Sequence, residues 1–159
     1  MRAYEYEHTV GFEETNLVGN VYFARFVSWQ GRCRELFLRD HAPDVLDQLR
    51  GDLRLVTVEC ACRYLAELDA LDEVTLRMRL EELGQTQLLL GFHYLRRAPD
   101  GVEQLVATGR QRIACMRREG ARLVPTRVPT SLELALRRYG ALPAADQRAG
   151  GPLGNGDAP

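Results

Sequence analysis

The spacing of apolar residues changes twice along the chain, and each change marks a different kind of element. Residues 3–12 alternate tyrosine with glutamate, and this period of two predicts a strand. From Val21 to Arg39 apolar residues recur every three or four positions without a proline, which predicts one long helix with a wide apolar face. Pro43 ends this helix, and residues 44–49 are expected to add one or two further helical turns.

The middle of the chain returns to a period of two. Turn signals interrupt this alternation at Leu83–Thr86 and at Ala98–Gly101, where proline, aspartate and glycine follow one another. The pattern predicts four more strands, at 53–64, 74–81, 87–96 and 102–116. One strand, one long helix and four further strands describe an α+β fold. We expect a single five-stranded antiparallel sheet wrapped around one long central helix.

Two prolines, Pro125 and Pro129, interrupt the chain before its last periodic segment. A short helix is expected over 132–138, with Thr130 or Ser131 as its N-cap. Beyond it the composition shifts to glycine, alanine, proline and aspartate. We therefore predict one domain over 1–140 and a disordered tail over 141–159.

The chain contains no lysine, and all 21 basic side chains are arginines. Schiff-base chemistry on a lysine and a phosphate-binding P-loop are therefore excluded. The net charge of −1 hides an asymmetry. Residues 1–90 carry 10 arginines against 16 acidic residues, whereas 91–140 carry 10 against 4. This balance is not that of a nucleic-acid-binding protein, and no apolar run is long enough to span a membrane.

Cysteine usage and the lack of an N-terminal signal segment predict a cytoplasmic, reduced protein. We expect the four cysteines to behave mainly as small core residues, and no histidine or cysteine has the spacing of a metal site. Catalysis by serine is poorly supported, because the two serines, Ser28 and Ser131, do not lie in a G-x-S-x-G turn.

Polar residues gather just before the long helix. The amides near its start, at Gly19, Asn20 and Tyr22, are candidates to hold an oxyanion, since a helix N-terminus offers unpaired N–H groups. Simple capping by Asn16 or Asn20 is the alternative explanation. The aromatic residues that follow are candidates to line an apolar channel, although core packing would also explain them. They are Tyr22, Phe23, Phe26 and Trp29.

The stretch V-x-F-E-E-T-N-x-x-G-N-V-Y-F-x-R-F, running into the long helix, resembles the signature of the 4-hydroxybenzoyl-CoA thioesterase-like hotdog family. The departures from that signature are informative. The family's catalytic aspartate falls on Asn16, its motif histidine on Phe23, the following asparagine on Arg25, and the helix glutamate of related members on Gly31. Together with W-Q-G-R-C-R-E, this variant is similar to the thioesterases that act with enediyne polyketide synthases.

That resemblance implies catalysis by an asparagine and an arginine, which map to Asn16 and Arg34. An asparagine is no general base, but it can position water or hydrogen-bond a carbonyl. An arginine stays charged and presents a planar fork suited to a developing oxyanion. An arginine paired with an acidic residue on the helix surface is the alternative reading of Arg34. Three candidate bases also remain, namely Glu13, Glu14 and Glu35.

The resemblance implies hydrolysis of a β-ketoacyl or polyene thioester carried on the phosphopantetheine of an acyl carrier protein, without a further cofactor. Carrier proteins are acidic, so arginines in the basic third could guide docking; a solvated strand face is the alternative. The docking candidates are Arg96, Arg97, Arg117 and Arg118. A general acyl-CoA thioesterase and a non-catalytic acyl-binding protein are the other functions considered. A homo-oligomer, dimer or tetramer, is expected, with sites at subunit interfaces.

Overall fold

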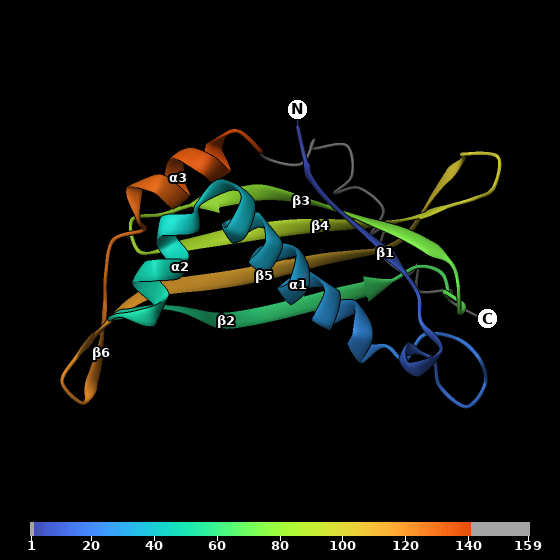
Figure 1. The fold of residues 1–159 in the computed structure, drawn as a ribbon, viewed down its shortest axis with the longest axis horizontal. Helices are drawn as coiled ribbons and strands as arrows, with labels where there is room; N and C mark the ends of the chain where they lie inside the picture. Colours follow the sequence, from blue (N-terminus) through green and yellow to red (C-terminus); the bar gives the residue numbers. More distant parts are fainter. Residues whose placement is uncertain (1, 141–159) are drawn as a thin grey trace, which may run out of the picture.

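A computed structural model describes residues 2–140, and the tail expected at 141–159 lies outside the described residues. The sheet has the strand order β1-β3-β4-β5-β2, with all neighbours antiparallel and a short β6 paired with the end of β5. One long helix, α1, crosses a face of this sheet (Figure 1). The predicted α+β fold, with an antiparallel sheet and one long central helix, is confirmed, and β6 adds a sixth strand to the five expected. The strands are β1 (Tyr4–Thr9), β2 (Leu53–Tyr64), β3 (Glu73–Leu83), β4 (Gln87–Arg97), β5 (Glu103–Glu119) and β6 (Arg122–Pro125).

The helices agree with the expected pattern, with shifted ends. They are α1 (Ala24–His41), α2 (Pro43–Arg50), α3 (Thr130–Arg137) and a short 3₁₀ turn, η1 (Phe12–Glu14). The start of α1 was predicted near Val21, but the backbone amides of Val21 and Tyr22 donate to the carbonyls of Leu68 and Glu14. These tertiary hydrogen bonds hold the segment extended, so the helix begins three residues later.

The end of the described chain differs from the prediction at two points. The proline-containing segment after β5 forms β6, in which Pro125 lies opposite Met116 at the end of the ladder. The N-cap of α3 is Pro129, without a side-chain cap. The hydroxyl of Ser131 instead donates to Asp44 Oδ2 at 2.6 Å and ties α3 to α2.

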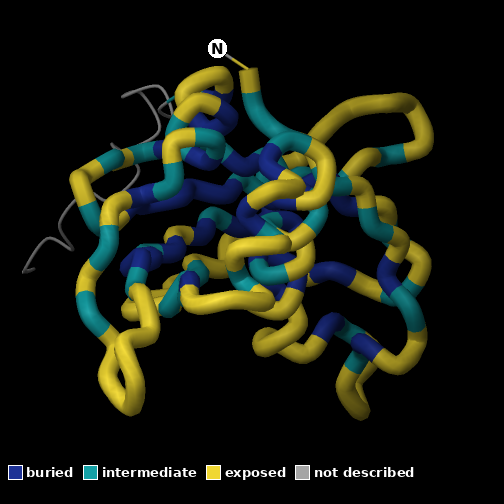
Figure 2. The backbone as a smooth tube through the Cα atoms, turned by 60° about the vertical axis from the view of Figure 1, so that its left-hand side comes forward, coloured by how far each residue is buried: buried dark blue, intermediate teal, exposed yellow. Residues whose placement is uncertain are grey.

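The core lies between α1 and the sheet. Phe37 and Cys33 of α1 are buried against strand residues such as Leu76, Phe92 and Ile113. Figure 2 shows the buried segments in the interior of the molecule and the exposed ones at the loops. No helix among residues 2–140 is long and apolar enough to cross a membrane.

The edge strand β2 is unusual because neither of its faces is fully covered. Five consecutive residues, from Thr57 to Ala61, are exposed, and Val58 keeps 52% of its surface accessible. The opposite edge of the sheet is β1. An uncovered, partly apolar edge strand of this length is a template for pairing with another strand.

Candidate active site

Asn16 lies at the base of a small hairpin loop that precedes α1. Thr15 pairs with Val21, and the Asn16 backbone exchanges hydrogen bonds with Asn20 and Gly19. Gly19 has a φ of 96°, a conformation that favours glycine. The Asn16 Oδ1 accepts the Val18 amide at 3.0 Å, so the side-chain carbonyl is used within the loop. The Asn16 amide nitrogen makes no hydrogen bond to another described residue and remains an open donor.

Glu14 anchors the same loop from beneath. Its Oε1 accepts the Gly11 amide at 2.9 Å and lies 2.6 Å from His8 Nε2, while Oε2 accepts the Trp29 indole N–H at 2.6 Å. Burial raises the pKa of Glu14, but the hydrogen bonds from Gly11, Trp29 and His8 outweigh it, and the pKa lies below its ordinary value. A carboxylate stabilised in its ionised form by these donors is a weak base. Glu14 is therefore a structural anchor.

The other two candidate bases lie on the surface. Glu13 is exposed, and only its backbone carbonyl is engaged, by Arg25 Nη2 at 3.2 Å. Glu35 is exposed on α1 and lies 3.9 Å from Arg32, one helical turn away. Neither carboxylate contacts Asn16 or Arg34 through a hydrogen bond within residues 2–140. The geometry does not assign either of them a role as general base.

The amides proposed for the oxyanion are mostly engaged. The Gly19 amide donates to the Asn16 carbonyl, and the Tyr22 amide donates to the Glu14 carbonyl. Both are therefore excluded as open oxyanion donors. The Asn20 Oδ1 is buried without a hydrogen-bond partner in the described chain. The first amides of the helix, those of Phe23 and Ala24, have no hydrogen-bond partner among the described residues.

Arg34 projects from α1 toward β2 and β5. Its Nη1 donates to Thr57 Oγ1 and to Gln111 Oε1, both at 2.9 Å. Burial lowers the pKa of the guanidinium, an effect that Glu35 and Cys60 partly oppose, but an arginine remains protonated. No ion pair engages Arg34 in residues 2–140, so the surface ion pair considered from sequence is wrong. Its positive charge is held by two neutral oxygens.

Asn16 and Arg34 do not meet within one chain. The Asn16 loop lies beside the start of α1, because Tyr22 is bonded to Glu14. Arg34 follows Ala24 by ten residues, or about 15 Å along a helix that rises 1.5 Å per residue. No hydrogen bond joins the two residues among residues 2–140. Within one chain the two residues of the predicted pair are therefore separated.

The four aromatic residues expected to line a channel separate into two groups. Tyr22 and Phe23 are exposed and stack with ring centroids 4.7 Å apart. Phe26 and Trp29 are each only 3% exposed and belong to the core. These side chains therefore do not form one channel. An apolar cavity of about 10 Å³ lies instead behind Arg34, between α1, α3 and the sheet. It is lined by Arg34, Phe37, Leu38, Leu55, Leu88, Leu90, Ile113, Leu132 and Leu136.

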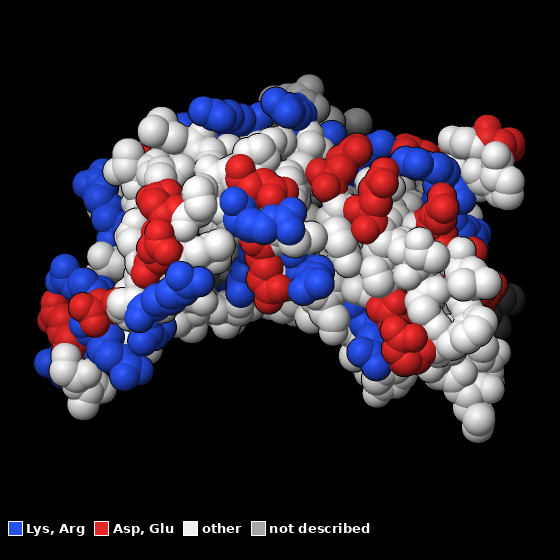
Figure 3. Space-filling view, in the orientation of Figure 1, with Lys and Arg blue, Asp and Glu red and all other residues white. Residues whose placement is uncertain are grey.

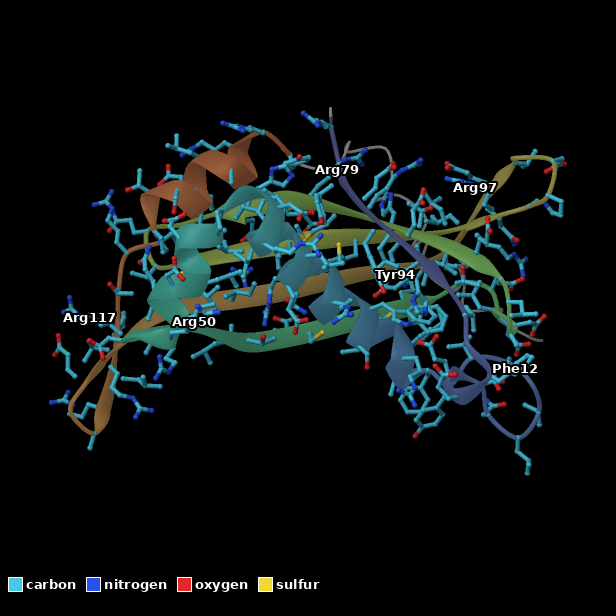
Figure 4. All side chains as sticks on the ribbon, viewed as in Figure 1. Phe12, Arg50, Arg79, Tyr94, Arg97 and Arg117 are labelled. Atoms are coloured by element: carbon cyan, nitrogen blue, oxygen red, sulfur yellow. The ribbon has the colours of Figure 1, made fainter. Side chains whose placement is uncertain are left out.

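The arginines proposed for docking lie at opposite ends of the sheet. Figure 4 shows Arg97 near the β4–β5 turn and Arg117 near β6. Arg96 and Arg97 lie 3.5 Å from Asp72 and Glu7, respectively. Arg117 pairs with Glu119, while Arg118 makes no ion pair within residues 2–140. Figure 3 shows blue and red side chains mixed at the end where β6 lies. The four residues therefore do not form one surface.

The cysteines differ in burial. Cys33 and Cys115 are fully buried, and burial raises their pKa to about 12 and about 11, as expected for core thiols. Cys60 is exposed on β2, and Cys62 is half-buried, so the expectation of a core role fails for Cys60. Within residues 2–140 no three histidine, cysteine or acidic side chains are grouped so as to hold a metal ion.

Sequence reasoning missed three residues around the candidate arginine. Thr57 and Gln111 hold the guanidinium, and Gln30, one helical turn before Arg34, continues the polar contacts into the core. Gln30 lies four residues before Arg34 on the same helix face, which is otherwise apolar. That spacing was the one signal available, since residues four apart share a face.

A sequence profile of the thioesterase-like superfamily matches residues 10–136. No curated protein sequence gives a significant match to the chain. Among solved structures, the dynemicin thioesterase, crystallised in a study of polyene binding, is 50% identical with a TM-score of 0.84, and the match covers 89% of this chain and 99% of that chain.

More distant structures share the fold. The 4-hydroxybenzoyl-CoA thioesterase of Pseudomonas sp. strain CBS-3 is 18% identical with a TM-score of 0.71, covering 85% of this chain and 99% of that chain. The 1,4-dihydroxy-2-naphthoyl-CoA thioesterase of Synechocystis is also 18% identical with a TM-score of 0.71, covering 85% and 96%. At these identities the likeness concerns the hotdog fold alone.

Proposed function

This chain belongs to the thioesterase-like superfamily and hydrolyses thioesters, and we propose that its substrate is a β-ketoacyl or polyene chain on the acyl carrier protein of an iterative enediyne polyketide synthase. The observation that carries the proposal is the 50% identity to the dynemicin thioesterase over 99% of that chain. Two further observations support it: Asn16 replaces the family's aspartate, and Arg34 is hydrogen-bonded to the neutral side chains of Thr57 and Gln111. All four cysteines are free, which fits the cytoplasm as the site of action.

The proposed reaction uses charge stabilisation rather than a carboxylate base. A water oxygen attacks the thioester carbonyl carbon, and the carbonyl oxygen becomes an oxyanion. The guanidinium of Arg34 and the amides of Phe23 and Ala24 stabilise this charge, while the Asn16 amide group positions the water. The C–S bond then breaks, the pantetheine sulfur takes up the proton that the water loses, and the free acid departs. A β-keto thioester is already electrophilic, so this assistance suffices.

A second copy of the chain completes the site in this proposal. The exposed stretch of β2 is centred on Glu59. A twofold antiparallel pairing about Glu59 or Cys60 places Thr57 opposite Ala61 or Arg63 of the partner subunit, respectively. Thr57 contacts Arg34. The far end of β2 lies at the start of α1, because the Tyr64 hydroxyl donates to the Phe23 carbonyl at 2.8 Å. Such a dimer brings Arg34 toward the partner's helix start and its Asn16 loop.

The carrier protein is proposed to dock at the β5–β6 end. Arg118, Arg122 and Arg127 are exposed there and make no ion pair within the described chain, and Arg117 lies beside them. Arg96 and Arg97 are less suited, because both already face acidic side chains. An acidic carrier helix would be attracted to unpaired arginines and oriented by them.

The test compares carrier-bound and CoA-bound forms of the same β-ketoacyl chain. The purified protein is expected to hydrolyse the carrier-bound chain with the higher kcat/KM. Arg34→Ala and Asn16→Ala are expected to slow it, and Arg32→Ala, on the exposed face of the same helix, serves as the control. A preference for acyl-CoA would indicate the general thioesterase instead. Tight binding of the acyl chain without hydrolysis would contradict the proposal altogether.

A further inference from the structure

A row of polar side chains runs from α1 to β2 and β5 along the border of the core. Only four polar or charged residues are buried in residues 2–140, and Gln30 and Gln111 are two of them, at 0% and 4% exposure. Both point into the layer between α1 and the sheet, and both belong to one chain of hydrogen bonds that begins at Arg34. A buried polar group without a partner is costly, so such a row persists only where its members satisfy one another.

The hydrogen bonds in this row all run in one direction. Arg34 can only donate, so the Gln111 atom that faces it is the oxygen. The Gln111 Nε2 then lies 3.9 Å from Cys60 Sγ, the Cys60 thiol donates to Gln30 Oε1 at 3.2 Å, and Gln30 Nε2 donates to the Ala61 carbonyl at 3.0 Å. Turning Gln111 over would place donor against donor at Arg34, and turning Gln30 over would place oxygen against oxygen at Ala61. The row therefore fixes which end of Gln111 meets the guanidinium.

The sheet leaves room for this arrangement at Gly109. A Cβ at that position would lie 2.2 Å from Gln30 Nε2, which real structures do not tolerate. Gly109 lies on β5, two residues before Gln111 and on the same face of the strand. The absence of a side chain at Gly109 of β5 thus makes room for the Gln30 side chain of α1.

The hydrogen-bond partners of Arg34 are neutral, whereas most arginines on the sheet are paired with acidic side chains. On β5 itself Arg112 lies 3.0 Å from Glu82 and Arg110 lies 3.0 Å from Glu81. Arg34 instead contacts a hydroxyl and an amide oxygen, both through Nη1. Its Nε and Nη2 make no hydrogen bond to a described residue and are not among the buried unpaired atoms, so they remain accessible.

We propose that Gln111 is a positioning residue that holds the Arg34 guanidinium through Nη1, without neutralising it, so that Nε and Nη2 face the thioester oxygen. This inference rests on the proposed catalytic role of Arg34. A carboxylate at position 111 would hold the same nitrogen equally well but would compensate its charge. An amide keeps the geometry and leaves the full positive charge for the oxyanion.

The test uses a small β-ketoacyl N-acetylcysteamine thioester, so that carrier docking plays no part. Q111L is expected to lower kcat roughly 10- to 100-fold with little change in KM, because the guanidinium loses its holding group. Q111E is expected to lower kcat at neutral pH, because a carboxylate beside Nη1 compensates the charge of Arg34. The charged and titratable groups around position 111 are Arg34 and Glu35 on α1 and Cys60 on β2, while β4 contributes Leu90.

The matched control is Q104E. Gln104 lies on the same strand and also accepts a hydrogen bond from an arginine, Arg96, outside the site. This variant is expected to keep the wild-type rate and the wild-type pH profile. Circular dichroism and thermal unfolding of each variant check that the fold is intact, and Thr57→Val, which removes the other acceptor of Arg34, serves if Q111L does not fold.

A double-variant cycle separates this inference from the proposed function. If Gln111 acts through Arg34, adding Q111E to R34A costs no further activity. A further loss in that background would overturn the positioning role. Wild-type activity in folded Q111L and Q111E, with R34A impaired, would overturn it too while leaving the proposed function intact. Wild-type activity in R34A would overturn the role of Arg34 itself.

Discussion

The indole nitrogen of Trp29 donates a 2.6 Å hydrogen bond to Glu14 Oε2, so that α1 and the loop carrying Asn16 are joined by one buried carboxylate. The other oxygen accepts the Gly11 amide at 2.9 Å. The loop before the helix has few other buried contacts, since Leu17 and Val18 are almost fully exposed. The position of Asn16 relative to α1 therefore depends on Glu14.

Glu14→Gln is expected to destabilise the protein by about 1–3 kcal/mol, because an amide NH₂ then faces a donor in place of an acceptor. Chemical denaturation at pH 7 measures the change. Glu13→Gln, a substitution on the neighbouring exposed side chain, is the control and is expected to have almost no effect. Equal stability of the Glu14→Gln variant and the wild type would show that the three donors find other partners.

The stability difference between wild type and Glu14→Gln is expected to depend on pH. The pKa of Glu14 is lowered in the folded state below its ordinary value of 4.5, so its contribution is fully present above that pH. As the pH falls through the lower folded pKa, the carboxylate is protonated in both states and the contribution is lost. Chemical denaturation of both proteins at pH 7 and pH 3 measures this difference. The free energies of unfolding of wild type and Glu14→Gln should lie closer together at pH 3 than at pH 7. A difference that stays constant would contradict ionisation of Glu14 as its source.

Arg34→Lys is expected to lose most of the activity, although it keeps the charge. A lysine ammonium cannot donate to Thr57 and Gln111 and still present further N–H groups in a fixed plane. A loss of about 100- to 1,000-fold in kcat, the effect of removing one oxyanion donor, is expected in single-turnover assays. Arg32→Lys on the exposed face of α1 should retain full activity. Full activity of Arg34→Lys would mean that charge alone suffices.

The cavity behind Arg34 is expected to limit the length of the acyl chain that the enzyme accepts. At about 10 Å³ it is too small for a long chain, so a chain that enters it must displace its lining. Leu132→Phe narrows it further and should lower kcat/KM for long chains more than for short ones. Leu134→Phe, on the exposed side of α3 at 59% exposure, should leave the chain-length preference unchanged. An identical effect on all chain lengths would place the acyl chain elsewhere.

Charge reversal at the β5–β6 end is expected to affect only carrier-bound substrate. Arg118→Glu with Arg122→Glu should raise KM for the acyl carrier protein and weaken its salt dependence, because encounter is steered by charge. The small synthetic thioester should be hydrolysed at the wild-type rate. Arg138→Glu, at the exposed end of α3, is the control. An equal rise in KM for both substrates would point to a defect in the site or the fold.

Mixing two inactive variants tests the shared site. If Asn16 and Arg34 act across the subunit interface, a dimer with one Asn16→Ala and one Arg34→Ala subunit contains one intact site. Random mixing should then restore about a quarter of the wild-type activity, since half of the dimers are mixed and each has one intact site of two. Sedimentation or light scattering checks that the dimer forms. No recovery after complete subunit exchange would place both residues in one subunit's site.

The periodicity of the chain determined the order of its elements and the α+β fold, because strand and helix patterns depend on local spacing alone. The resemblance carried by the motif before α1 and by W-Q-G-R-C-R-E within it indicated Asn16 and Arg34 as candidates. The tertiary structure decided what these residues touch. The start of α1 depends on amide bonds to Glu14 and Leu68. Gln111, a neutral hydrogen-bond partner of Arg34, lies 77 residues away in the sequence. Such contacts arise only when α1 packs on the sheet, and no local pattern encodes them.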